Sequence, residues 1–183
     1  MSNEKTQTKV VTGEVRLSYA HIWEPAAIGD SEEKKYSVAI IISKDDEATL
    51  SRYNKALEAA KAAGKAKWGG KIPAKLKTPL RDGDEERPDD EAYKNSFFIN
   101  CTSKTKPGVV DKDLNPVQDK EEVYSGCYAR VSFNLYPFDV SGNKGIAAGL
   151  ANIQKLADGE KLAGGSSAEE DFAEEFEESS LLD

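Results

Sequence analysis

Residues 123–138 read VYSGCYARVSFNLYPF, and from Cys127 onward apolar and polar side chains alternate. Because successive side chains of a β-strand point to opposite faces, this alternation predicts a strand with one face in the core and one in water. The predicted core face consists of Cys127, Ala129, Val131, Phe133 and Leu135. The predicted water face carries aromatic rings and a positive charge, on Tyr128, Arg130, Tyr136 and Phe138. Such a surface suits stacked bases and phosphates, although exposed tyrosines also cover cross-strand neighbours in ordinary sheets.

Four further strands are predicted, at residues 10–19, 36–42, 96–102 and 146–153. In the first of them, one face would carry Val11, Gly13, Val15, Leu17 and Tyr19. The second reads YSVAIII, a continuous apolar run that favours a central, buried strand. The last follows a Gly-Asn turn and would form a hairpin with the strand quoted above. Residues 21–25, HIWEP, are expected to leave the first strand and enter a loop.

One long helix is predicted between the second and third strands. Ser43 followed by Asp46 approximates a capping box, apolar residues then recur at helical spacing, and the helix should end near Gly64. About five strands and one long helix indicate a mainly β protein of α+β character. This count fits the OB-fold, a five-stranded barrel that holds oligonucleotides, here with extended loops.

The net charge of −8 is concentrated at the C-terminus. Residues 164–183 hold eight acidic residues and no basic one, whereas residues 1–163 hold 25 of each. We therefore expect a folded domain over residues 1–163, followed by a flexible linker and a disordered acidic tail over residues 164–183. The tail could compete with DNA for a basic groove and recruit partner proteins through apolar residues, namely Phe172, Phe176, Leu181 and Leu182. The alternative is a tail that only aids solubility.

A basic stretch runs from Lys55 to Arg81, with a net charge of +7 and one tryptophan, Trp68. Basic residues around a large ring fit a flexible arm over a polyanion. A solvated helix end and a lysine-rich loop would give the same pattern. The ring itself has two alternative roles, because it either anchors the loop on the core or stacks on a base.

No catalytic, metal or cofactor motif emerges. Cys101 and Cys127 have no metal-ligand spacing and are expected to be buried thiols, and His21 is the only histidine. Gly64-Lys65 lacks the rest of a phosphate loop, and the acidic run at residues 81–91 resembles a calcium loop only loosely. We therefore expect a non-enzymatic protein without a cofactor. No secretion signal or membrane-length apolar run occurs, so a cytoplasmic location is expected.

The run YSGCYARVSFNLYPFDVSGNKGIAAGLANIQKLADGE at residues 124–160 resembles the Enc34-like phage single-stranded DNA-binding proteins (DUF2815). The segment VRLSYAHIWEP at residues 15–25 and the acidic end fit the same family. The resemblance implies an OB-fold that binds single-stranded DNA without strong sequence preference, in phage DNA replication or recombination within a bacterial host. The tail is similar to that of T7-type phage binders, which end in an aromatic residue, whereas this chain ends in Leu-Leu-Asp.

We therefore expect a protein that coats single-stranded DNA. Its rings would stack on bases and its cations would neutralise phosphates. The expected DNA-binding residues are Trp68, Tyr128, Arg130, Tyr136, Phe138, Lys67, Lys71, Lys75, Lys77, Lys104 and Lys106. Two alternatives remain open, namely a single-strand annealing or recombination mediator and a protein-interaction adaptor that acts through the acidic tail.

Overall fold

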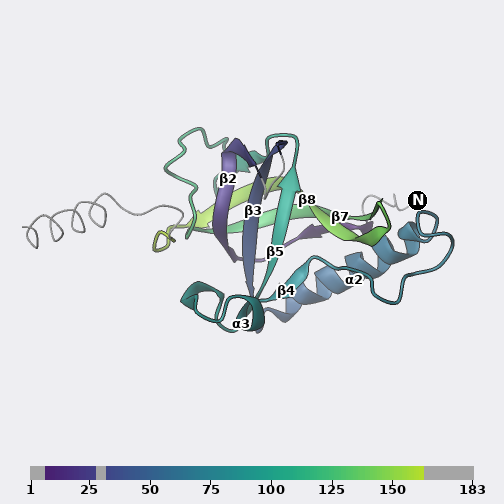
Figure 1. The fold of residues 1–183 in the computed structure, drawn as a ribbon. Helices are drawn as coiled ribbons and strands as arrows, with labels where there is room; N and C mark the ends of the chain where they lie inside the picture. The colour runs from purple at the N-terminus through teal and green to yellow at the C-terminus, as the bar shows by residue number, and fades with distance from the viewer. Residues whose placement is uncertain (1–6, 28–31, 163–183) are drawn as a thin grey trace, which may run out of the picture.

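The computed structural model describes residues 7–27 and 32–162, and this part of the chain is a β-sheet with one long helix at its side (Figure 1). The strands are β1 (Lys9–Val11), β2 (Val15–Ala27), β3 (Lys34–Ser43), β4 (Leu80–Asp82), β5 (Ser96–Ser103), β6 (Gly108–Val110), β7 (Tyr128–Val140) and β8 (Asn143–Ala157). The helices are α2 (Glu47–Gly64), the short α3 (Gly83–Glu86) and the 3-10 turn η1 (Glu91–Tyr93). The predicted mainly β class with one long helix is confirmed. The predicted tail lies outside the described residues.

Strand β7 is the sequence stretch quoted at the outset, and it has the predicted inner and outer faces. Its inward residues Ala129, Val131, Phe133 and Leu135 are buried, as is Cys127 just before it. The predicted hairpin is also present, because β7 pairs antiparallel with β8 from Tyr128 to Val140. The other edge of β7 pairs with β2 and then with β1.

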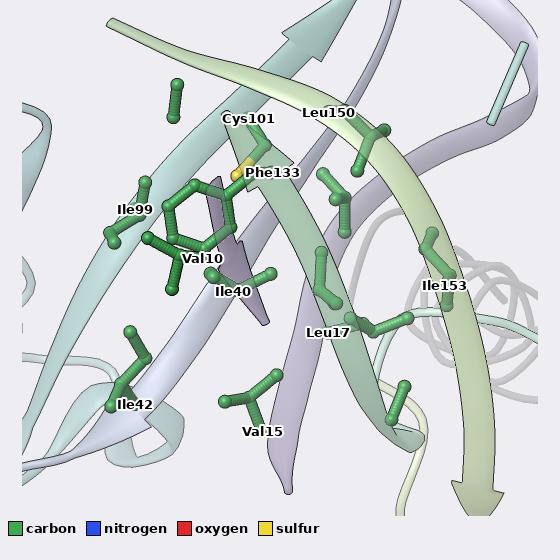
Figure 2. Close-up of a cluster of buried hydrophobic side chains, with 14 of the residues drawn as sticks. Val10, Val15, Leu17, Ile40, Ile42, Ile99, Cys101, Phe133, Leu150 and Ile153 are labelled. Carbon is green, nitrogen blue, oxygen red and sulfur yellow. The ribbon is translucent and has the colours of Figure 1, made fainter. Parts of the chain in front are cut away.

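The long strands pair in a closed circuit. β7 pairs with β2, β2 with β3, and β3 with β5, all antiparallel. β5 then pairs with β8 in parallel, and β8 returns to β7. The predicted central strand, β3, therefore has a partner on each edge. The side chains inside the circuit form the main core, in which Val10, Leu17, Ile40, Ile99 and Phe133 are fully buried (Figure 2).

The two cysteines lie in this core, as the sequence predicts. Cys101 and Cys127 are both buried, and both are free thiols. Burial raises the pKa of each thiol because a thiolate would lose its hydration. Among the described helices, none is long and apolar enough to span a membrane.

The first predicted strand is interrupted. Residues 10–19 form two strands, β1 and β2, that are separated at residues 12–14, and Val11, which the sequence pattern groups with Val15 and Leu17, is exposed. The break lies at Thr12, which bonds to Val131 of β7 in two ways. Its hydroxyl accepts a hydrogen bond from the backbone N–H of Val131, and its own backbone N–H donates to the carbonyl oxygen of Val131. In addition, β2 continues through residues 21–25, where a loop was expected.

The helix begins three residues later than predicted. Asp46 is the N-cap, and its carboxylate accepts the backbone N–H of Thr49 at 3.1 Å, while Ser43 is the last residue of β3. The helix ends at Gly64 as expected. Its buried face includes Tyr53, Ala56 and Ala60, and it packs beside β7. Three short strands, β1, β4 and β6, bring the strand count above the predicted five.

Candidate nucleic-acid interface

The outer face of β2, β3 and β5 carries small and polar side chains in cross-strand rows. Strand pairing places Ser18, Ala39 and Asn100 in one row, and His21, Ser37 and Thr102 in the next. Residues paired directly across a sheet share a face, so these side chains lie on the side opposite the core. A pocket of about 240 Å³ opens here, lined by Tyr19, Ser37, Val38, Ala39, Arg87, Asn100 and Thr102. We call this surface the groove face.

Tyr19 reaches the groove face because β2 is irregular there. The pairing register with β3 shifts between Ser18 and His21, and Tyr19 has a left-handed backbone with φ +46°. A bulky residue in this region is strained by about 1–2 kcal/mol. The ring is 44% exposed, so Tyr19 does not share the buried face of Val15 and Leu17 with which the sequence pattern groups it. Backbone strain that holds an aromatic ring in solvent is typical of a functional position.

Arg87 forms one wall of the pocket and stacks against aromatic rings. Its guanidinium carbon lies 5.3 Å from the ring centroid of Tyr19, 5.7 Å from that of Tyr93 and 5.8 Å from that of Phe98. Acidic residues flank it in sequence, yet its guanidinium has no ion pair or hydrogen bond within residues 7–27 and 32–162. Its N–H donors are therefore available to an incoming phosphate or base.

The segment that carries Arg87 is held by Lys44, at the end of β3. The Lys44 ammonium lies 2.9 Å from the carboxylate of Asp82 and 2.8 Å from that of Asp84. The hydrogen bond to Lys44 is the main cause that lowers the pKa of both carboxyls. Asp84 also accepts the backbone N–H of Asn95, which joins the start of α3 to the start of β5.

We expect Lys44→Met to lower the thermal midpoint at pH 7, and we expect the difference from the wild type to shrink as the pH falls through the lowered pKa of Asp82 and Asp84. Asp82 and Asp84 have folded-state pKa values below those of the unfolded chain, so their contribution is complete above the unfolded pKa of about 3.9. It is lost as the pH falls through the folded pKa. Thermal unfolding of both proteins across this range measures the effect. Lys55→Met, at an exposed position of α2, is the matched control, and an undiminished difference at low pH would contradict the assignment.

Trp68 does not belong to an exposed DNA-binding surface. The indole is 4% exposed, and its Nε1 donates to the carbonyl oxygen of Phe138 at 3.0 Å. Its ring packs so closely on Gly64 that a Cβ there would lie 2.6 Å from it. The sequence leaves two roles open for this ring. The structure supports the first of them, in which the ring anchors the loop on the core. We remove Trp68 from the candidate set.

The anchor fastens the basic arm, residues 65–77, to the tip of the β7–β8 hairpin. The Lys67 ammonium lies 3.4 Å from the carbonyl oxygen of Pro137, and the backbone of Lys77 bonds to Lys144 and Ile146. Tyr136, which is 41% exposed, and the half-buried Phe138 lie on the same hairpin. We call Lys67, Lys77, Tyr136 and Phe138 the hairpin–arm surface. Lys71 and Lys75 are exposed on the same arm.

The remaining predicted residues lie elsewhere. Tyr128 is half-buried and is covered by Arg16, whose guanidinium carbon lies 5.6 Å from its ring centroid. Arg130 is exposed, but its Nε donates to the carbonyl oxygen of Thr12. Lys104 pairs with Glu33 at 3.2 Å, and Lys106 lies over the ring of Trp23. The predicted residues therefore do not form one cluster.

The groove face and the hairpin–arm surface are nevertheless joined across β8. Thr102 pairs with Gly149, and Tyr136 on the next strand pairs with Ala147. The Tyr136 ring lies against Gly149, because a Cβ built there would be 3.5 Å from the ring. Small residues, Ala147 and Gly149, thus line the outer surface between Thr102 and Tyr136.

The groove face was missed because no local motif marks it. The alternation of SFFINCT does place Asn100 and Thr102 on the face opposite the core residues Ile99 and Cys101, so the sequence indicates the contribution of β5 to the groove face. Tyr19 and Arg87 had no such signal. Tyr19 is turned outward by an irregularity in β2, and Arg87 comes from a loop that looked like an acidic surface turn.

The described chain ends beside this face. Leu162 packs against the outer cluster of Ile41, Tyr93 and Phe98, and its N–H donates to the carbonyl oxygen of Ser125. Leu162 also lines a second pocket together with Tyr19 and Arg87. Leu162, the last described residue, therefore lies at the edge of the groove face.

Comparison with known proteins agrees with this architecture. The sequence profile of the family described as "Enterobacter phage Enc34, ssDNA-binding protein" matches residues 8–182. Protein p50 of Acyrthosiphon pisum secondary endosymbiont phage 1 is 27% identical over 96% of both chains.

Two solved structures have a similar fold. The single-stranded DNA-binding protein from bacteriophage Enc34 in complex with ssDNA superimposes with a TM-score of 0.75 at 23% identity, covering 89% of this chain and 96% of that one. The single-stranded DNA-binding protein gp2.5 of bacteriophage T7 superimposes with a TM-score of 0.60 at 19% identity, covering 91% and 93%. With the family profile matching nearly the whole chain, the protein belongs to the Enc34 family of phage single-stranded DNA-binding proteins.

Proposed function

We propose that this protein binds single-stranded DNA without catalysis and with little sequence preference. The closed circuit of β2, β3, β5, β8 and β7 is the strand arrangement expected of an OB-fold barrel, which we propose it to be. The groove face then includes β3 and β5, the second and third strands of that barrel, where OB-folds hold oligonucleotides. Membership of the Enc34 family supports the same function.

The observation that carries the proposal is the pairing of Tyr19 with Arg87. A strained, exposed ring next to a guanidinium with open donors provides a stacking surface and a cation in one place. Both groups are useful to a single strand, whose bases are unstacked and whose phosphates are charged. In an ordinary surface position such backbone strain at a tyrosine would not be expected.

We propose that the strand runs from the groove face to the hairpin–arm surface. Lys35, two residues before Ser37 on β3, supplies positive charge at one end. Lys67 and Lys77 supply it at the other, with Tyr136 as a second exposed ring. Lys71 and Lys75 are further phosphate contacts that we propose. Tyr128, Arg130, Lys104 and Lys106 are secondary contacts, because protein groups already engage them.

We further propose that the protein serves phage DNA replication or recombination in the cytoplasm of the bacterial host. Single strands exposed by these processes need a protein that covers them without modifying them.

The acidic tail, in this proposal, competes with DNA for the groove face and recruits proteins when DNA displaces it. The starting point of the tail supports the first role, because Leu162 lines a pocket together with Arg87. The apolar residues Phe172, Phe176, Leu181 and Leu182 would contact the partner proteins.

Fluorescence anisotropy with a labelled thymidine oligomer tests the function. We expect salt-sensitive binding, with a log–log slope of about −0.7 per phosphate neutralised, so that about five contacts would give a slope of about −3.5. A duplex of the same length should bind more weakly. Absence of binding to the single strand at low salt would contradict the proposal and favour an adaptor that acts through the tail, and pairing of complementary strands in a mixing assay would instead favour an annealing mediator.

A further inference from the structure

The pocket in the groove face has polar groups without protein partners. Ser37, Asn100 and Thr102 line it, and no side chain of the three makes a hydrogen bond to another described residue, over 7–27 and 32–162. An amide and two hydroxyls supply both donors and acceptors, and these are left to solvent in the unbound protein. Three such groups from two neighbouring strands therefore converge on one small space.

The size and walls of the pocket suit one planar ring. Its volume of about 240 Å³ lies below the range of roughly 300–1,000 Å³ found for drug-sized ligands. Tyr19 provides a flat aromatic wall, and Ala39 leaves the floor low. Arg87, at the rim, presents N–H donors to a sugar or phosphate that is attached to such a ligand ring. A flat wall, polar groups and a rim cation together match a nucleotide unit.

We propose that this pocket holds one unpaired nucleobase of the bound strand, with its Watson–Crick edge on Asn100, Ser37 and Thr102. The inference rests on the proposed single-strand binding and assigns part of its selectivity to these residues. In a duplex the Watson–Crick edge is occupied by the partner base, so the pocket accepts only an unpaired base. Hydroxyls rotate to donate or accept, and an amide presents both groups, so the pocket tolerates different bases.

The strained backbone of Tyr19 supports this assignment. A left-handed conformation at a tyrosine persists only when the surroundings enforce it, and the guanidinium of Arg87 lies over the ring, 5.3 Å from its centroid. The ring is thus fixed before DNA arrives, which reduces the entropy lost when a base stacks on it.

Two oligomers of equal length separate base contacts from backbone contacts. One is a thymidine oligomer, and the other is an abasic oligomer with the same number of phosphates. We expect full-length Asn100→Ala and Tyr19→Ala to bind the thymidine oligomer about tenfold more weakly than the wild type, in line with the usual cost of losing one base contact. On the abasic oligomer both variants should bind as the wild type does.

Three controls make the result decisive. Asn54→Ala, on the exposed side of α2, should bind both oligomers like the wild type. Tyr19→Phe keeps the ring and should retain most of the affinity, and melting by circular dichroism verifies that each variant is folded. Equal losses on both oligomers, or no loss on either, would overturn the base subsite while leaving single-strand binding in place. Failure of the wild type to bind the thymidine oligomer at low salt would overturn both.

Discussion

Replacing Trp68 by alanine is expected to lower the free energy of unfolding by about 3–5 kcal/mol, the usual cost of deleting a buried large aromatic side chain. The indole is 4% exposed and packs on Gly64, and its N–H satisfies the carbonyl oxygen of Phe138. The variant therefore loses apolar contacts and leaves an acceptor without its donor. The basic arm should detach from the hairpin tip as a result.

Urea unfolding followed by circular dichroism measures this loss without using tryptophan fluorescence. Trp68→Phe keeps most of the ring and should lose distinctly less stability. Ile72→Ala, at a side chain 41% exposed on the same arm, is the control for a surface position and should change little. If Trp68→Ala unfolds like the wild type but binds a thymidine oligomer about tenfold more weakly, the ring contacts DNA and its assignment as an anchor is wrong.

Ending the chain after Leu162 is expected to tighten binding to single-stranded DNA by about tenfold at low salt, or about 1.4 kcal/mol. The removed segment carries all eight acidic residues of the tail and starts at the edge of the groove face. All described strands lie before this point, so the fold should be retained. Because salt screens the repulsion, the gain should shrink as the salt concentration rises.

Anisotropy titrations of both proteins at two salt concentrations provide the measurement. A full-length variant with the eight tail carboxylates changed to amides separates charge from chain length, and it should bind as tightly as the shortened protein. Equal affinities for the full-length and shortened proteins would contradict competition by the tail. In that case the tail would act on partner proteins or on solubility alone.

Much of the fold could be predicted from the sequence because burial leaves a clear apolar pattern in the long strands. In β7, the alternation of Val131 and Phe133 with polar neighbours follows the two faces of the strand directly. Continuous apolar character likewise marks β3, which has strand partners on both edges. The short strands β1, β4 and β6 have three residues each, too few for any periodicity to identify them.

The candidate site was less predictable because it depends on irregular backbone. A register shift in β2 turns Tyr19 away from the core, and alternation carried through such a shift assigns the wrong face. Arg87 lies in an acidic loop whose position depends on an ion-pair network with Lys44. Trp68 shows the opposite case. Its lysine-rich sequence neighbourhood suggests an exposed ring, whereas packing against a glycine buries it.

The strand circuit has a consequence for synthesis of the protein on the ribosome. β1 and β2 cannot form their pairing with β7 until β7 has been synthesised, because Val15 pairs with Ala129 and Lys9 with Asn134. Until the C-terminal third emerges, the N-terminal strands expose unpaired edges and apolar side chains, which favour aggregation. Contacts so distant in sequence also slow folding. The core can therefore close only after β7 and β8 have emerged from the ribosome.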